Sequence, residues 1–359
     1  MKPVRIPSPA GHATQPGQPA RPQPDPWHVS ADDFPADGTQ EEQLWFMLQY
    51  AILAPSPLNT QPWRFHLQRT QVDLRADTAR ALPALDPHGR ALTISCGGAL
   101  FHLRVAMEYF GYASRVQLLP DDTDPTLMAR AWLGMHCETP AEVLTLFNAI
   151  PKRRTSRQPF VGDPVPEDLL AQLQAEAQTE GAWLQFVTDE AARVAVADLI
   201  AQADRVQWAN KEFRSELAHW LHPNRVASRD GLPASAEGFG DWASRVGPLV
   251  VRTFDLGKGH AAKDRDIALG SPALVVLGTE EEGPPSWLAA GQALAKVLLR
   301  AQAESLSASF LNQPIEVAEL RPRLAELIGR GGFPQVLLRL GYGREVPPTP
   351  RRPLREFLV

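Results

Sequence analysis

Apolar residues recur along the chain at two spacings, which together predict a mixture of helices and strands. In residues 41–54, Leu44, Met47, Leu48 and Ala51 fall on one helical face, and Pro55 ends the helix. The same spacing predicts further helices at 98–110, 142–150, 166–178, 190–221, 287–304 and 317–328. Alternating or continuous apolar runs predict strands at 63–67, 72–74, 114–119, 129–135, 183–187, 273–277 and 335–340.

A faint internal repeat divides the chain into two units. Gly97-x-Ala99-Leu100-x-x-Leu103 matches Gly291-x-Ala293-Leu294-x-x-Val297, and without a gap Pro120 then falls on Pro314. Apolar runs at 91–94 and 273–277, interpreted as strands, precede the two copies. Amphipathic helices share apolar spacing by necessity, but the flanking runs and prolines also line up, which favours duplication. We expect an N-terminal half at 39–150 and a C-terminal half at 151–359.

Two segments lack this periodicity. Residues 1–38 are rich in proline and polar residues, so we expect a disordered or extended tail, or a strap over the surface. Residues 222–245 are rich in Gly, Pro, Ser and Asn and form a long segment without a clear pattern. With Phe239 and Trp242 this segment could serve as a lid over a flat ligand, or it could be a surface excursion.

Composition excludes several classes of protein. The formal net charge is −5, which gives no basic field for nucleic acid. Cys96 and Cys137 form neither a disulfide framework nor a metal-ligand cluster. No apolar run reaches membrane-spanning length and no secretion signal is visible, so we expect a cytoplasmic protein. We expect no metal, because the sequence lacks paired His or Cys motifs.

The segment between the first helix and the first strand carries side chains that suit a planar heterocycle. Its prolines stiffen a loop with hydroxyl and amide groups, which both donate and accept hydrogen bonds. These residues are Pro55, Ser56, Asn59 and Gln61. The alternative is a turn in which Ser and Asn bond to their own backbone.

Two basic segments suit a phosphate. Residues 152–157 hold four cations and two hydroxyls, among them Arg153, Thr155 and Arg157. Arg351 and Arg352 lie near the C-terminus. The alternative for both segments is a solvated basic run.

In this order, the three segments resemble the nitroreductase superfamily. Pro55-Ser56-x-x-Asn59-x-Gln61-Pro62-Trp63 is similar to its ring-contacting loop, Arg153-x-Thr155-x-Arg157 to its Arg-x-Ser-x-Arg phosphate motif, and Arg351-Arg352 to its basic end. In ordinary members, which are homodimers, the arginine motif precedes the loop; here it follows the loop by about ninety residues. Residues 40–359 therefore resemble the Acg-type branch, in which two half-domains are fused.

This resemblance implies an α+β, nitroreductase-like fold: an intrachain pseudo-dimer of two fused half-domains, each a mainly antiparallel sheet packed by helices. One FMN would lie between the halves. The two arginine segments would hold its phosphate, and the Pro-Ser loop would contact its ring.

The resemblance also implies an FMN-dependent NAD(P)H oxidoreductase that reduces an electron-poor acceptor in a ping-pong cycle. The flavin would carry the redox chemistry, so we assign no catalytic residue. Two alternatives stay open: a protein that stores or sequesters FMN under a lid at 222–245, and a flavin-free remnant. We expect a monomer or a weak homo-oligomer.

Overall fold

The fold contains two four-stranded sheets with the same strand order. In the computed structural model we describe residues 25–224, 228–233 and 246–359. The first sheet is ordered β1 (Trp63–Gln68), β2 (Gln71–Ala76), β4 (Leu127–His136), β3 (Tyr112–Leu118). The second is ordered β5 (Trp183–Phe186), β8 (Ala273–Thr279), β10 (Phe333–Gly341), β9 (Ser307–Phe310). All neighbours in both sheets are antiparallel, which confirms the predicted fold of two similar halves.

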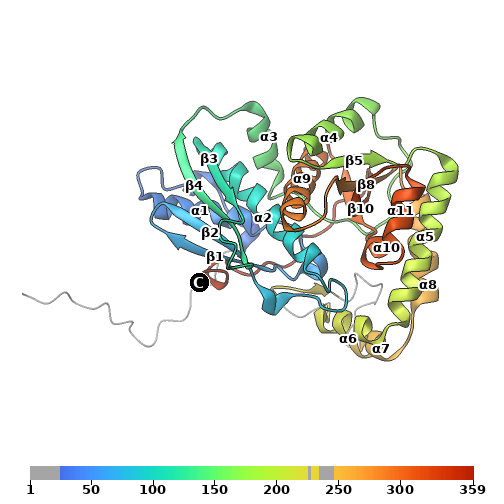
Figure 1. Cartoon of the computed structure of the whole chain (residues 1–359). Coiled ribbons are helices and arrows are strands. Elements are labelled where there is room, and N and C mark those ends of the chain that lie inside the picture. The colour runs from blue at the N-terminus through green and yellow to red at the C-terminus, as the bar shows by residue number, and fades with distance from the viewer. Residues whose placement is uncertain (1–24, 225–227, 234–245) are drawn as a thin grey trace, which may run out of the picture.

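Two helices of 20 residues each, α2 (Arg90–Tyr109) and α9 (Pro284–Ala303), pack together between the two sheets (Figure 1). They cross at Gly97 and Gly291. A Cβ on Gly97 would lie 3.0 Å from the Cα of Gly291, and a Cβ on Gly291 2.9 Å from the Cα of Gly97. Each would lie closer still to a backbone oxygen, that of Leu288 or of Ile94 respectively. The repeat aligns these residues pairwise, so the contact is self-complementary, like that of a two-fold dimer.

The apolar run at 91–94, expected to be a strand, lies instead in the first turns of α2, which begins at Arg90 and not near residue 98. Leu92, Thr93 and Ile94 are buried. A short apolar run in a helix buried on several sides cannot be told from a buried strand by its periodicity.

Three more helices flank the strands of the two halves. Helix α1 (Gln40–Ala51) begins with a capping box between Thr39 and Glu42. Helix α3 (Ala141–Ala149) follows the first sheet, and α4 (Glu167–Thr179) precedes β5. The segment after α3 crosses to the second sheet, where Thr155 pairs with Ala308 of β9.

The halves differ between their first two strands. Strands β1 and β2 are joined by the turn Arg69-Thr70, whereas β5 and β8 are separated by residues 187–272. This insertion contains α5 (Glu190–Ala209), α6 (Lys211–Trp220), α7 (Gly247–Thr253), α8 (Gly257–Leu269) and the parallel pair β6 (Leu221–His222) and β7 (Leu232–Pro233). The single helix predicted at 190–221 breaks at Asn210, whose side chain caps α6. The patterns did not predict α7 or α8.

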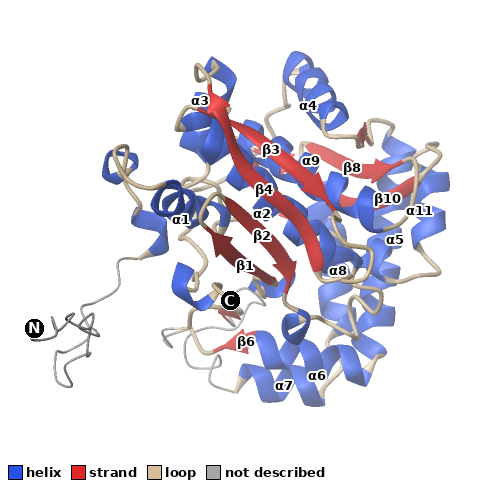
Figure 2. Cartoon of the chain, turned by 60° about the vertical axis from the view of Figure 1, so that its left-hand side comes forward, coloured by secondary structure: helices blue, strands red, loops and turns tan. Residues whose placement is uncertain are grey.

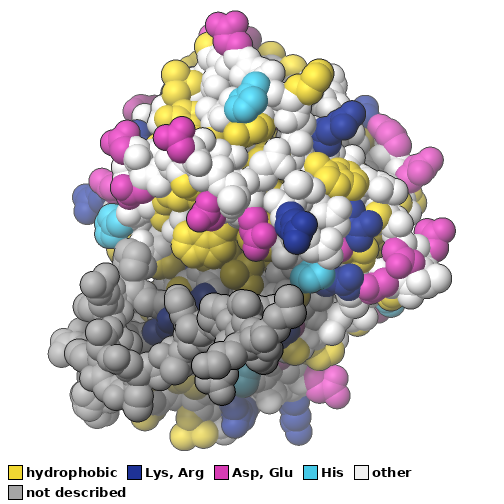
Figure 3. Space-filling model, turned by 90° about the vertical axis from the view of Figure 1, so that its left-hand side faces the viewer, with side chains coloured by type: hydrophobic (Ala, Val, Ile, Leu, Met, Phe, Trp, Pro, Cys, Tyr) yellow, Lys and Arg dark blue, Asp and Glu magenta, His cyan; other side chains and the backbone are white. Residues whose placement is uncertain are grey.

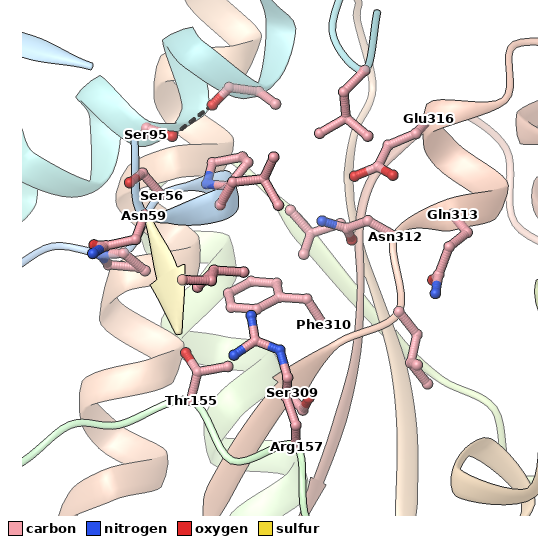
Figure 4. A pocket seen from close by; sticks show the side chains of 18 of the residues that line it. Ser56, Asn59, Ser95, Thr155, Arg157, Ser309, Phe310, Asn312, Gln313 and Glu316 are labelled. Atoms are coloured by element: carbon pink, nitrogen blue, oxygen red, sulfur yellow. Dashed lines mark hydrogen bonds between the residues drawn. The ribbon is translucent and has the colours of Figure 1, made fainter. Parts of the chain in front are cut away.

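The helix predicted at 317–328 is α11 (Arg321–Leu327), which begins four residues later than predicted. A short helix that the patterns did not predict, α10 (Gln313–Glu316), precedes it. The position of α10 matters because it follows β9 closely and carries polar side chains to the space between the halves (Figure 4).

Both ends of the described chain pack on the first half. Trp27, in a 3-10 helix at Pro26–His28, is buried, so residues 25–38 contact the body of the protein. At the other end, Phe65 of β1 donates its N–H to Phe357 O at 2.8 Å and accepts from Val359 N at 3.0 Å. The C-terminal arm, residues 342–359 after β10, therefore crosses from the second half to the first. The division at 38 and 150 stays a prediction, as does a cytoplasmic location; no helix among the described residues could cross a membrane.

Candidate functional site

A pocket lies where the two halves, the insertion and the C-terminal arm meet. Its wall is formed by the Pro-Ser loop, α2, the segment 153–157, α5, α8, the β9–α10 region and β10. Seven of the nine predicted site residues line it: Pro55, Ser56, Asn59, Arg153, Thr155, Arg157 and Arg351. Figure 4 shows Ser56 and Asn59 on one side, Thr155 and Arg157 below, and Asn312, Gln313 and Glu316 on the opposite side.

Arg153 and Arg351 form a buried cationic cluster at one end of the pocket. Burial, together with Arg154, lowers the pKa of Arg153 to about 10. Burial and the two neighbouring guanidiniums, Arg153 and Arg154, hold the pKa of Arg351 well below its usual value. Neither Arg153 nor Arg351 forms an ion pair with a carboxylate of the described residues, and the Nε of each lacks a hydrogen-bond partner there. Such a cluster is costly unless an anion lies against it.

The segment that carries Arg153 is fixed at the edge of the second sheet. Ser156 donates its N–H to Ala308 O at 3.0 Å, and Arg153 Nη1 lies 3.4 Å from the acceptor Thr155 Oγ1. Arg157 is exposed, and its side chain extends into the pocket toward Phe310 (Figure 4). The segment thus presents two guanidiniums and a hydroxyl to the same space, the donor set that a phosphate requires.

Arg351 is held by the first half. Its Nη2 donates to Leu53 O and Ala54 O at 3.3 and 3.0 Å, just beyond the C-terminal end of α1, where a cation is favoured. Its Nη1 donates to Asn59 Oδ1 at 2.6 Å. The C-terminal arm therefore brings a cation to the Pro-Ser loop, which is distant in the sequence.

The polar side chains of the Pro-Ser loop bond mainly to the protein. Ser56 Oγ accepts from Gln61 N at 2.9 Å. Asn59 Nδ2 donates to Gly231 O at 3.1 Å and Pro350 O at 3.0 Å. Leu58, Asn59 and Gln61 have positive φ values of 48°, 55° and 52°, so the loop is tightly constrained. A role for Ser56 and Asn59 in binding a ring stays a prediction.

Gln61 and Arg352 do not line the pocket. Gln61 Oε1 accepts from Arg352 N at 3.0 Å, and its Nε2 donates to Arg229 O at 2.9 Å. The Arg352 guanidinium bonds to Glu356 and packs over Phe357. These contacts fasten the loop to the C-terminal arm, and the predicted ligand contacts of Gln61 and Arg352 stay predictions.

The opposite wall holds polar residues that the sequence analysis missed. Arg90 Nη1 donates to Gln335 O at 2.6 Å, and Gln207 Nε2 donates to Glu316 Oε2 at 2.8 Å. Burial raises the pKa of Glu316 to about 7, against the opposing effects of Gln207 and Arg90. Arg339 of β10 also lines the pocket and packs over Phe160. One signal was available: Gln335 and Arg339 are polar residues inside an otherwise apolar strand.

The predicted lid falls partly outside the described residues, and Phe239 and Trp242 are among those not described. Its described part lies against the Pro-Ser loop region, because Asp230 pairs with Arg80, and Gly231 bonds to Asn59. Leu232 lines the pocket. The described residues contain no cluster of side chains suited to a metal ion.

The structure thus defines a protein of two similar, fused halves with a mixed polar and aromatic pocket between them. The chain is 35% identical over 325 residues to "Putative NAD(P)H nitroreductase Rv3131" of Mycobacterium tuberculosis, covering 88% of this chain and 91% of that protein. It is 30% identical over 326 residues to "Putative NAD(P)H nitroreductase acg" of the same organism, covering 86% and 93%. The chain therefore belongs to the nitroreductase family, in the branch that includes Acg, as its motifs indicated.

Other comparisons add less. No protein-family model matches the chain. The solved structure of the FMN- and NADPH-dependent nitroreductase NfnB from "sphigopyxis sp. strain HMH" is 22% identical and covers 59% of this chain and 96% of its own. The TM-score is 0.39, which is too low to transfer any feature of that site to this chain.

Proposed function

We propose that the protein is an FMN-dependent NAD(P)H oxidoreductase that binds one flavin per chain in the pocket between its halves. The observation that carries the proposal is the buried pair Arg153 and Arg351, which has no carboxylate partner among the described residues. A flavin phosphate would compensate both charges. The names of the mycobacterial relatives support the same class of reaction.

The residues divide into two groups by what they would contact. Arg153, Thr155 and Arg157 would hold the phosphate, with Arg351 supporting them from the first half. The Pro-Ser loop and the wall around Phe310 and Asn312 would border the ring (Figure 4). Bound FMN would supply the redox chemistry, accepting a hydride from NAD(P)H and delivering electrons to an electron-poor acceptor.

The phosphate assignment is tested by comparing FMN with riboflavin, which lacks the phosphate. A hydrogen bond to a charged group contributes roughly 1.5–3 kcal/mol, so Arg153→Ala should weaken FMN binding at least about tenfold. Riboflavin binding should change much less. Arg265→Ala, which removes an exposed arginine paired with Asp198, serves as the control and should leave both affinities unchanged. Equal losses of FMN and riboflavin in Arg153→Ala would contradict the assignment.

Enzyme activity is tested by mixing the flavin-loaded protein anaerobically with NADH or NADPH in a stopped-flow instrument. An oxidoreductase should lose the oxidised flavin absorbance rapidly with at least one of the two. Initial rates at several acceptor concentrations should then give parallel double-reciprocal lines, as a ping-pong cycle requires.

Storage of FMN is a second candidate because the insertion covers the same pocket. Trp208, Phe213 and Leu232 all border it, and contacts of residues 229–231 hold that segment on the Pro-Ser loop. A protein that retains FMN but is not reduced by either nicotinamide nucleotide would be a store. Purified protein that is colourless and gains no bound flavin would exclude both functions.

A further inference from the structure

Trp27 lies directly behind the predicted phosphate site, although more than a hundred residues separate it from the arginines there. Its side chain is buried, with 6% exposed, and it does not line the pocket. Its Nε1 donates to Thr349 O at 2.8 Å. The N-terminal segment is thereby fastened to the C-terminal arm two residues before Arg351.

Two guanidiniums pack on the Trp27 ring. The guanidinium carbon of Arg154 lies 4.2 Å, and that of Arg351 4.9 Å, from a ring centroid of Trp27. An aromatic face attracts a cation, and the attraction grows when water is excluded. Trp27 thus contacts one arginine next to the phosphate motif and one that lines the pocket.

The packing on Trp27 offsets part of the electrostatic repulsion between neighbouring arginines. Arg153, Arg154 and Arg351 lie close enough to disfavour one another's charge. Arg351 is also held within the C-terminal arm, since its Nη1 donates to Thr349 Oγ1 at 2.8 Å as well as to Asn59. Trp27 bonds to the same Thr349 that supports Arg351. The indole therefore holds the Arg351 guanidinium in two ways, by direct packing and through Thr349.

We propose that Trp27 is a positioning residue for the arginines at the phosphate end of the pocket, and that the N-terminal segment thereby sets the preference for a phosphorylated flavin over riboflavin. This inference rests on the proposed function. Trp27 acts through Arg351 and Arg154 and does not contact the ligand. Its loss should therefore affect the phosphate end and spare the ring end.

The experiment uses the full chain and measures the Kd of apo-protein for FMN and for riboflavin. Trp27→Leu removes the aromatic face and the indole N–H, and should weaken FMN binding about threefold to thirtyfold while riboflavin changes less than about twofold. Trp27→Phe keeps a ring but loses the N–H, and should lie between Trp27→Leu and the parent. Trp45→Leu, at a half-exposed position on α1, is the control and should leave the ratio of the two constants unchanged.

A purely structural role for Trp27 would weaken both ligands equally and would overturn the inference. If Trp27→Leu does not fold, an unchanged ratio in Trp27→Phe overturns it equally well. The proposed function fails separately: it fails if the parent protein binds FMN no better than riboflavin. The parent could prefer FMN over riboflavin and Arg153→Ala could lose this preference while both Trp27 variants keep it. This combination would overturn only the role of Trp27.

Discussion

The two sheets have the same strand order but different surroundings. The first sheet packs its apolar side chains on α1 and α2, and its other face carries polar side chains such as Gln71, Asp73 and Arg75. No helix lies in front of this face in Figure 2, and acidic and basic side chains are interspersed on this side of the molecule in Figure 3. In the second sheet, by contrast, every residue of β8 is buried.

Strand β8 is buried on both faces because the insertion adds a second core. Val275 and Leu277 pack toward α4 and α9, whereas Leu274 and Val276 pack toward α5 and α8. The sequence shows the same difference, since β2 alternates polar and apolar residues and β8 is a continuous apolar run. The two sheets together with α2 and α9, which we call the frame, are similar in the two halves. The insertion adds a wall to the pocket on one side of this frame.

The frame depends on the crossing of α2 and α9, so the largest effect should come from filling that crossing. Gly291→Val would force a branched side chain against the backbone of Ile94 and Gly97. Neither backbone can move without separating the helices, so we expect no stably folded protein. Expression in soluble form and the far-ultraviolet circular dichroism spectrum provide the measurement.

A helix glycine outside the frame provides the control for this substitution. A Cβ on Gly259 of α8 would meet no atom within 4 Å. Gly259→Ala should therefore raise the free energy of unfolding by roughly 0.5–1 kcal/mol, because alanine favours the helix. Wild-type stability in Gly291→Val would show that the halves do not meet at this crossing.

The next effect should come from a buried ion pair that ties α4 to α9. Arg300 Nε lies 2.7 Å from Glu176 Oε1, and both side chains are less than 10% exposed. Glu176→Gln leaves the buried Arg300 without its carboxylate, whereas the nearby Lys296 keeps its pairing with Glu142. The loss should cost about 3–5 kcal/mol in urea unfolding. Glu280→Gln breaks the exposed pair with Arg330 and should cost less than about 1 kcal/mol. Similar costs for the two variants would contradict the difference in burial.

The sequence predicted the repeated frame better than the insertion, for physical reasons. Half-buried strands and amphipathic helices have one buried face, so the spacing of their apolar residues predicts the element directly. The residues at 91–94 are buried from several sides, so their pattern resembled a strand. The break at Asn210 and the helices α7 and α8 depend on tertiary packing, which local periodicity does not record.

The site was predictable where residues are adjacent in the chain. The basic segment at 153–157 and the Pro-Ser loop both reach the pocket. The contact of Arg351 with Asn59, and the packing of Trp27 on Arg351, join segments from three distant regions. Gln61, which the sequence also assigns to the ligand, bonds to the C-terminal arm, a contact that the sequence alone does not show. Its ligand contact stays a prediction.

The smallest predicted effect concerns the titration of Glu316, a pocket residue that the insertion contacts through Gln207. Gln207 of the insertion bonds to Glu316, whose pKa burial raises from 4.5 to about 7; Arg90 lowers this pKa, and Asp86 and Glu216 raise it. Between pH 4.5 and about pH 7 the folded protein holds a proton on Glu316 that the unfolded chain has lost. The contribution of this carboxyl to the free energy of unfolding therefore falls as the pH rises.

Glu316→Gln should remove this dependence of stability on pH. Relative to the parent, the apo-variant should therefore become more stable by about 2–3 kcal/mol between pH 5 and pH 8 in urea unfolding. Glu319→Gln, an exposed position on the same segment, should follow the parent at every pH. A constant difference between Glu316→Gln and the parent would show that Glu316 has the same pKa in the folded and unfolded protein.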